Sequence, residues 1–425
     1  MSSPELDGLA VRAAWGVGDQ VFSSLTNFGL NILIARSLGA SAFGAFSLAF
    51  SIFVIAISIS RAFTSEPLVV RFSSSSRLEW ARGAAKASGL SVLLGVIVGS
   101  LCVLAAQFMT GDLRSAFLGV GICMPGLLLQ DLWRFSFFAV KRGDKSLLND
   151  FVWALIMFPL LIMMLRRDDP DLLHIVLTWG GAATVAGLFG VVQARVLPSL
   201  TSPRAWLTEH RDLTPSYAGE MVTGSVSSQL VFFGIGAVAS LAAVGAYRSA
   251  FVIFGPIRVL YQGLSLMGVS EAVRMVGKST ARLRHAAIRT SLVLASLAGA
   301  FGLFLGLMPN QWGVALLGTV WAAVDPLILP FTIGAIGLGM TMPVFIGMRA
   351  IQAAKRSFRT KLTVSSVEVV AAVVGASIGG AVGAAWAARP MVLLGSGLWW
   401  KRFGAELKRL PDSEPGSDGE VWISV

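Results

Sequence analysis

Twelve apolar stretches divide this sequence from end to end, and each is about 20 residues long, the length of a helix that crosses a bilayer. They fall near residues 14–37, 43–66, 86–108, 115–139, 147–165, 172–194, 216–239, 244–269, 287–307, 326–348, 362–379 and 382–400. Charged residues make up 13% of the chain, whereas soluble domains have roughly 25%. The sequence therefore predicts an all-α integral membrane protein with twelve transmembrane helices.

Positive charge alternates along the connections between these stretches. Every second connection carries several Lys and Arg residues, and these clusters begin at Arg71, Lys141, Arg195, Arg274, Arg349 and Lys401. The loops near 38–43, 240–244 and 380–382 carry no charge. Because cytoplasmic loops of membrane proteins collect Lys and Arg, the pattern predicts that both termini are cytoplasmic. It also accounts for the net charge of +11 without a nucleic-acid partner.

A repeat relates the two halves of the chain. A shift of 201 residues aligns residues 18–19 (Gly-Asp) with 219–220 (Gly-Glu), and 44–46 (Gly-Ala-Phe) with 245–247 (Gly-Ala-Tyr). With six spans in each half, both copies run in the same direction across the membrane. We expect a six-helix bundle over 1–195, a cytoplasmic linker over 196–214, a second six-helix bundle over 215–404 and a disordered cytoplasmic tail over 405–425.

Polar side chains inside the apolar stretches are the candidate functional groups, because such groups are costly in hydrocarbon and normally face a bundle interior or a watery cavity. Arg258 follows Pro256 deep within a span and has no acid within helical reach, so we expect it to face a central cavity. Arg134 and Asp131 lie three residues apart and are expected to pair on one helix.

Other polar groups in the spans have two interpretations. Asp19 and Glu220 are equivalent in the repeat, and they either hold helices together or bind a coupling H⁺ or Na⁺. Asn27, Asn31 and Gln229 either bond between helices or line a polar lumen, and their recurrence in both copies favours the lumen.

Catalytic and metal chemistry has little support in the sequence. The two cysteines lie in apolar stretches and the three histidines are scattered, so neither a disulfide framework nor a metal site is expected. The sequence contains no Walker-type lysine motif and no G-x-S-x-G elbow. We expect a protein that is not an enzyme and has no cofactor beyond a coupling ion.

Three segments carry a family resemblance: GDQVFSSLTNF, the following NILIARSLGASAFGAFSLAF, and the later LLGTVWAAVDPLILP. They resemble bacterial polysaccharide-unit flippases of the multidrug/oligosaccharidyl-lipid/polysaccharide (MOP) exporter superfamily, which includes the MATE drug exporters. The resemblance implies two MATE-like bundles that move a polyprenyl-phosphate-linked oligosaccharide across the bacterial cytoplasmic membrane by alternating access. Its partners would be this lipid-linked oligosaccharide, membrane lipids and other polysaccharide-assembly proteins.

The resemblance also implies a cationic cavity for the phosphate of the carrier lipid. Arginine suits this task because its planar guanidinium stays charged and binds phosphate oxygens bidentately. By depth and charge, the matching groups are Arg36, Arg248 and Arg258, with Arg61 and Arg134 as secondary candidates. Arg36 and Arg248 also lie close enough to helix ends to be interfacial anchors instead.

Two other functions remain open. A cation-coupled multidrug exporter would use Asp19 and Glu220 to carry the coupling ion, although an arginine-rich lumen would repel cationic drugs. A membrane enzyme of polysaccharide assembly usually has a large extracytoplasmic loop, and here the longest outer loop has about eighteen residues.

Overall fold

The computed structural model describes residues 3–201, 203–276 and 279–409. Within these ranges, no side chain is described for residues 3–14, 16, 17, 214–224, 265–267 and 270. All regular secondary structure in the described part of the chain is helical, and this part contains no strand.

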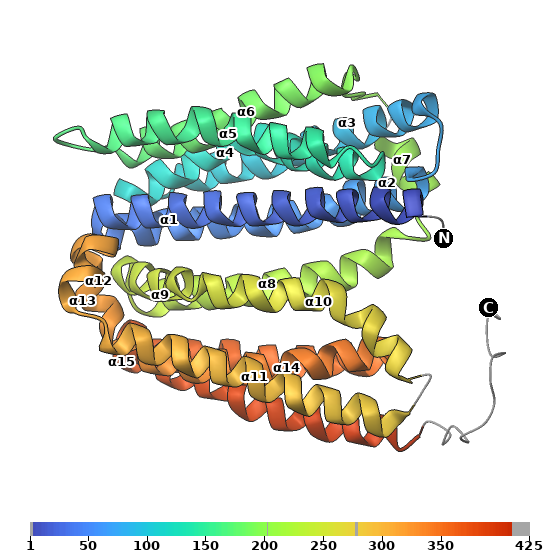
Figure 1. Ribbon diagram of the computed structural model, residues 1–425. Coiled ribbons are helices and arrows are strands. Elements are labelled where there is room, and N and C mark those ends of the chain that lie inside the picture. The colour runs from blue at the N-terminus through green and yellow to red at the C-terminus, as the bar shows by residue number, and fades with distance from the viewer. Residues whose placement is uncertain (1–2, 202, 277–278, 410–425) are drawn as a thin grey trace.

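The two halves of the chain lie in two layers (Figure 1). The upper layer contains α1 (Ser3–Ser60), a π-helical turn (Arg61–Ser65), α2 (Glu66–Phe72), α3 (Arg77–Ala106), α4 (Gly111–Ala139), α5 (Gly143–Leu165) and α6 (Leu172–Ala194). The lower layer contains α8 (Thr214–Val238), α9 (Leu241–Ile253), α10 (Gly255–Val276), α11 (Thr280–Leu307), α14 (Ile328–Ala350) and α15 (Ala354–Leu407). Two short helices, α12 (Asn310–Leu317) and α13 (Trp321–Val324), lie at one end of the molecule.

Helix α1 is a hairpin rather than one straight rod. Gly39 has φ 76° and ψ 175°, a conformation that glycine adopts without steric cost. Asp19 and Arg61 contact neighbouring side chains of α4, although 42 residues of straight helix would separate them by about 63 Å. The chain therefore reverses at Gly39, and the two arms of α1 run side by side.

Helix α15 folds back in the same way at Gly379 and Gly380, where the backbone leaves the helical conformation. A Cβ on Gly375 would overlap the carbonyl oxygen of Gly383, so the two arms are in backbone contact. The second arm continues to Leu407, into the range where we expected a disordered tail. Residues 410–425 of that expected tail lie outside the described residues.

The described helices include eight that are long and apolar enough to cross a membrane, or nine if the bent pair 241–253 and 255–264 counts as one span. This bend of 50° lies just before Pro256, whose ring removes a backbone donor from the helix. The count confirms a multi-pass membrane protein. It falls short of the expected twelve spans, which stay a prediction: each of the hairpins α1 and α15 enters the count once, and the described apolar part of α8, Ser225–Val238, is too short to be counted.

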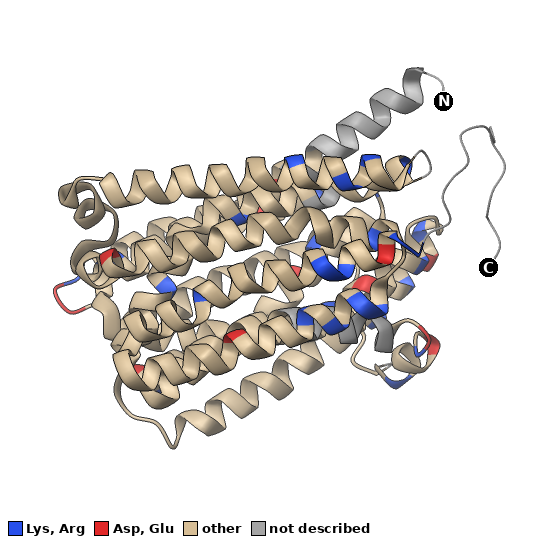
Figure 2. Ribbon diagram, turned by 90° about the horizontal axis from the view of Figure 1, so that it is seen from below, with Lys and Arg blue, Asp and Glu red and all other residues tan. Residues whose placement is uncertain are grey.

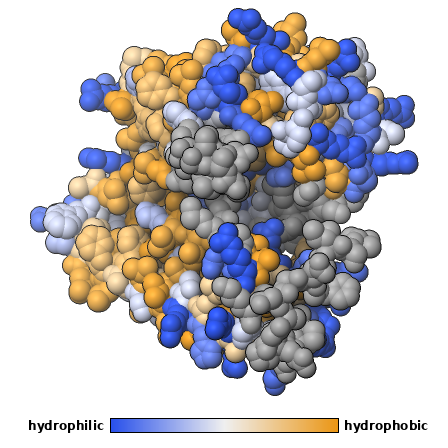
Figure 3. Space-filling view, turned by 45° about the vertical axis from the view of Figure 1, so that its right-hand side comes forward, coloured by the Kyte–Doolittle hydropathy of each residue, from blue (hydrophilic) through white to orange (hydrophobic). Residues whose placement is uncertain are grey.

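Charge is distributed unevenly along the molecule. Most Lys and Arg residues lie at the end of the molecule where both termini emerge (Figure 2), and we call this the basic end. Hydrophobic residues cover the surface next to that end (Figure 3). This pattern is typical of a protein whose middle contacts lipid.

The linker between the halves is docked against the first half through α7 (Pro203–Glu209). The indole Nε1 of Trp206 donates to the carbonyl of Phe63 at 2.8 Å, and its ring stacks on His210 with 3.9 Å between centroids. Lys86 pairs with Glu209 at 2.7 Å. Burial lowers the pKa of His210 below its ordinary value, so the neutral ring is favoured in this contact.

Candidate functional site

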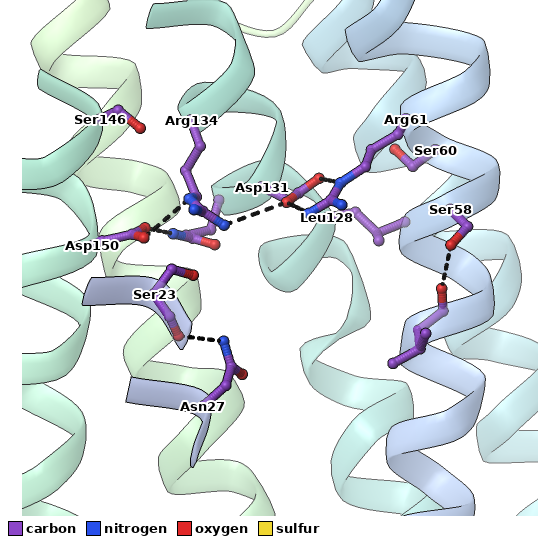
Figure 4. A network of polar contacts seen from close by, with 12 residues as sticks. Ser23, Asn27, Ser58, Ser60, Arg61, Leu128, Asp131, Arg134, Ser146 and Asp150 are labelled. Atoms are coloured by element: carbon purple, nitrogen blue, oxygen red, sulfur yellow. Dashed lines mark hydrogen bonds and ion pairs between the residues drawn. The ribbon is translucent and has the colours of Figure 1, made fainter. Parts of the chain in front are cut away.

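A buried ion-pair network joins α1, α4 and α5 in the first half (Figure 4). Arg134 lies at its centre: Nη2 is 2.9 Å from Asp19 Oδ2, and Nε is 3.0 Å from Asp150 Oδ2. Arg61 donates two hydrogen bonds, of 2.6 and 2.8 Å, to Asp131. The expected pair between Asp131 and Arg134 is the longest contact, at 4.0 Å.

Neighbouring polar groups hold these carboxylates in place. Ser146 donates to Asp19 Oδ1 at 2.9 Å, and Gln130 donates to Asp150 Oδ1 at 2.8 Å. The residues Asp19, Asp131 and Asp150 are at most 2% exposed. Among the described side chains of the network, three carboxylates therefore face two guanidinium groups, and one negative charge is left over.

The second half contains a cavity of about 220 Å³ between α8, α9, α10, α14 and α15. A second cavity of about 360 Å³ shares part of its wall, including Arg258, Ser365 and Glu368. The lining of the first cavity includes five aromatic side chains and two arginines, besides aliphatic residues and serines. The members used below are Tyr247, Phe251, Arg258, Phe331, Glu368 and Arg389.

Two arginines of this cavity differ in how they are held. Arg389 Nη1 is 3.2 Å from Glu368, and its Nε donates to the hydroxyl of Tyr247 at 2.9 Å. Arg258 lies over the ring of Phe251 at 3.7 Å and makes no ion pair within the described residues. Among the described residues, the cavity wall therefore has two guanidinium groups against one carboxylate, an excess of one positive charge.

Arg248 lies behind this wall, where the two halves meet. Its guanidinium is within 4.8 Å of the Phe50 ring, 5.1 Å of Phe232 and 5.5 Å of Phe251. It is 5% exposed, and its Nε has no hydrogen-bond partner within the described residues. Phe50 belongs to the first half, so this cation is held between aromatic rings from both halves.

The halves are in backbone contact one helical turn from Arg248. A Cβ on Gly44 would overlap the carbonyl oxygen of Leu241, and one on Gly245 would overlap that of Ala40. Each such Cβ would also lie 3.1 Å from the amide nitrogen of the other glycine. Residues 40 and 44 correspond to 241 and 245 in the 201-residue repeat, so the contact is reciprocal, as a local two-fold axis requires.

The structure separates the arginines that the sequence grouped together. Arg258 lines the cavity and Arg248 lies behind its wall, whereas Arg61 and Arg134 are bound by aspartates in the other half. The side chain of Arg36 is exposed near the end of the first arm of α1 and lines neither cavity.

The other candidate polar residues lie on α1 and α8. Asn27 and Asn31 donate to the carbonyls of the residues four earlier on their own helix, at 2.9 and 2.7 Å. Gln229 donates to the hydroxyl of its neighbour Ser228 at 3.0 Å. Asp19 belongs to the network above, and the side chain of Glu220 lies outside the described residues.

Several residues of both sites were given no role from the sequence: Gln130, Asp150, Tyr247, Glu368 and Arg389. Four of them are polar or charged residues inside predicted spans, which is the signal that pointed to Arg258. Tyr247 has a different signal. The repeat aligns it with Phe46, and only the second copy carries a hydroxyl.

No family model and no curated protein matches this sequence. Solved structures do match it in fold. An inward-facing multidrug resistance MATE family transporter of the MOP superfamily matches with TM-score 0.69 and 14% identity, over 91% of this chain and 96% of that one. Lipid II flippase MurJ, in an inward closed conformation, matches with TM-score 0.66 and 12% identity, over 93% of this chain and 89% of that one.

An outward-facing MATE transporter of the MOP superfamily matches less well, with TM-score 0.56 and 14% identity over 94% of this chain and 96% of that one. At these identities the likeness concerns the fold. It confirms the MATE-like architecture that we expected from the sequence.

Proposed function

We propose that this chain is a transporter that flips a polyprenyl-phosphate-linked oligosaccharide from the inner to the outer leaflet of the bacterial cytoplasmic membrane, for cell-surface polysaccharide export. The observation that carries this proposal is the cavity of Arg258 and Arg389, which has excess positive charge and aromatic walls. Such a cavity suits a phosphate that is attached to a sugar, because guanidinium binds phosphate and aromatic rings pack on sugar faces.

The proposal includes a topology of twelve spans. The hairpins α1 and α15 each cross the membrane twice, and α3, α4, α5, α6, α8, the bent pair α9–α10, α11 and α14 each cross it once. Each half is then a six-helix bundle. The basic end faces the cytoplasm, in keeping with the excess of Lys and Arg in cytoplasmic loops.

Alternating access would follow from the contact between the halves. The reciprocal contact of Gly44 and Gly245 lies away from the basic end and closes the outer side. The better match to the inward-facing than to the outward-facing MATE structure supports the same state. The head group would then enter from the cytoplasm and bind Arg258, while the lipid tail stays in the bilayer.

Arg258→Gln is expected to slow flipping by roughly tenfold to a hundredfold, because one or two charge-assisted hydrogen bonds to the phosphate are lost. The assay is the inner-to-outer transfer of a fluorescent polyprenyl-pyrophosphate-linked disaccharide in proteoliposomes. Arg258→Lys, which keeps the charge but not the planar fork, should fall in between. Arg36→Gln is the matched control, and because Arg36 is exposed outside both cavities its rate should equal that of the parent.

An unchanged rate in Arg258→Gln would refute the anion cavity. A cationic dye in the same vesicles tests the rival function of multidrug export. The cation-rich cavity should exclude the dye, whereas dye transport by the parent protein would favour the exporter.

The network of the first half is the proposed site of coupling to H⁺ or Na⁺, because its surplus carboxylate charge can accept one cation. Asp150→Asn removes this surplus and keeps an oxygen to accept the hydrogen bond from Gln130. We expect the variant to flip the probe at the parent's basal rate, but without the acceleration that an imposed ion gradient gives the parent. Separate H⁺ and Na⁺ gradients identify the ion, and equal acceleration of parent and variant would exclude this site.

A further inference from the structure

A groove of about 620 Å³ lies at the basic end, between the first turns of α11 and the last turns of α15. It is separate from both cavities of the proposed substrate site. Among the residues that line it are Arg284, His285, Trp400, Lys401, Gly404 and Lys408, and none of the lining residues that the structure describes is acidic. The groove is therefore a concentrated positive site at the end of two membrane-length helices.

No acidic neighbour in the described part of the chain neutralises the cations of this groove. Arg284, Lys401 and Lys408 are exposed, and none forms an ion pair within the described residues. Glu406, two residues before Lys408, pairs instead with Arg356 and Arg409. Three positive side chains thus converge on one groove with no bound counter-charge from the described part of the chain.

The face of α11 that holds Arg284 becomes apolar toward the middle of the molecule. Ile288 and Leu292 follow at intervals of four residues, which places all three side chains on one face of the helix. Leu292 is 61% exposed. Along this face of the helix, a cationic side chain is thus followed within about two turns by exposed aliphatic side chains.

Helix α15, on the opposite side of the groove, has the same arrangement: cationic side chains at the basic end and an exposed aliphatic side chain toward the middle of the molecule. Leu394, Lys401 and Lys408 are spaced by seven residues and share a face, and Leu394 is 68% exposed. Gly397 and Gly404 lie on this face too, and a Cβ on either would meet nothing within 4 Å. The groove thus has an open floor beside its cations.

Trp400 closes one side of the groove at a fixed position, because its Nε1 donates to the carbonyl of Met340 at 3.1 Å. Tryptophan favours the depth of lipid head groups, where its ring is partly in the apolar region and its N–H is bonded. The groove therefore lies at the level where a lipid phosphate would be.

We propose that this groove binds an anionic phospholipid of the adjacent leaflet. Its phosphate would lie among Arg284, Lys401 and Lys408, and its acyl chains would follow Leu292 on α11 and Leu394 on α15. Basic residues just outside the hydrocarbon region attract anionic lipid head groups, and here the exposed apolar tracks on both helices fit the chains of the same molecule. This lipid is a resident partner and not the transported substrate.

The test measures lipid binding to the full-length, delipidated protein by native mass spectrometry, with phosphatidylglycerol and phosphatidylcholine as probes. The parent should bind one phosphatidylglycerol more tightly than phosphatidylcholine by roughly tenfold or more, as expected for several basic side chains at the membrane surface. The triple variant Arg284→Gln, Lys401→Gln, Lys408→Gln should lose this preference.

A matched control removes the same charge at the same end of the molecule but outside the groove: Arg282→Gln, Lys355→Gln and Arg359→Gln, all at exposed positions. It should keep the parent's preference. If it loses as much as the groove variant, diffuse attraction explains the binding and the groove is refuted.

Two further arms separate a lipid site from a simple anion site. Gly404→Trp fills the groove without changing its charge, and it should abolish the preference for phosphatidylglycerol over phosphatidylcholine. A retained preference would place the lipid elsewhere.

Soluble glycerol phosphate should not displace phosphatidylglycerol at millimolar concentration, because it lacks the acyl chains. Displacement as effective as that by the lipid itself would overturn the proposal. Since the readout is binding and not flipping, its failure is distinguishable from failure of the proposed function.

Discussion

Arg134→Gln is expected to destabilise the folded protein by about 3–5 kcal/mol, the usual effect of removing one partner from a buried ion pair. Arg134 is the cation for both Asp19 and Asp150, whereas Asp131 retains its two hydrogen bonds from Arg61. Two nearly inaccessible carboxylates would then lack a counter-charge between packed helices. Thermal unfolding of the purified protein in detergent measures the loss.

Arg142→Gln is the matched control for this prediction. Arg142 pairs with Asp144 at 2.6 Å, as closely as any pair in the network, but both side chains are largely exposed. Exposed pairs contribute roughly 0–1 kcal/mol, so the control should unfold nearly as the parent does. Adding Asp150→Asn to Arg134→Gln should restore part of the lost stability, because it removes one uncompensated charge. Equal losses at Arg134 and Arg142 would contradict the network.

Much of the fold could be predicted from the sequence because hydrocarbon imposes a simple length rule on helices. The predicted spans 14–37 and 43–66 are separated where α1 reverses at Gly39, and 362–379 and 382–400 are separated at Gly379 and Gly380. The predicted single span 244–269 is bent instead between α9 and α10. A hydropathy profile identifies apolar segments, but it does not show where a helix bends within such a segment.

The candidate site was harder to predict, because depth in the membrane follows from sequence position whereas the rotation and neighbours of a helix do not. Arg134 was expected to pair with Asp131 on its own helix, yet its closest carboxylates come from α1 and α5. Arg36 was placed among the substrate residues by depth, and its side chain is exposed outside both cavities. Contacts between helices decide both which carboxylates Arg134 binds and where the Arg36 side chain lies.

Gly44→Ala is expected to abolish most transport, because the added methyl group would overlap the carbonyl of Leu241 across the contact between the halves. Neither backbone can yield without moving a whole helix, so the halves must separate at this contact, which lies on the outer side in the proposed topology. Overpacking of this kind costs roughly 1–3 kcal/mol, and that shift would move the protein toward states with an open outer side. The proteoliposome flipping assay measures the loss.

The reciprocity of the contact makes a second, more specific prediction for the same assay. Gly245→Ala introduces the equivalent overlap with Ala40 and should have the same effect as Gly44→Ala. Since both substitutions disturb one contact, the double variant should be little worse than either single variant, and not as severe as the sum of two independent effects. Gly181→Ala is the matched control, because a Cβ there meets nothing within 4 Å.

Accessibility separates an opened outer side from a general loss of folding. Ser47 is fully buried one turn from Gly44, and Ser47→Cys in a background without Cys102 and Cys123 places a thiol behind the contact. A membrane-impermeant maleimide should label this thiol in the Gly44→Ala protein and leave it unlabelled with Gly44 intact. Labelling that is the same in both, together with transport at the parent rate, would show that the close approach of Gly44 and Gly245 does not close the outer side. The opposite result would identify one pair of repeated glycines as the point where the halves must part for each cycle.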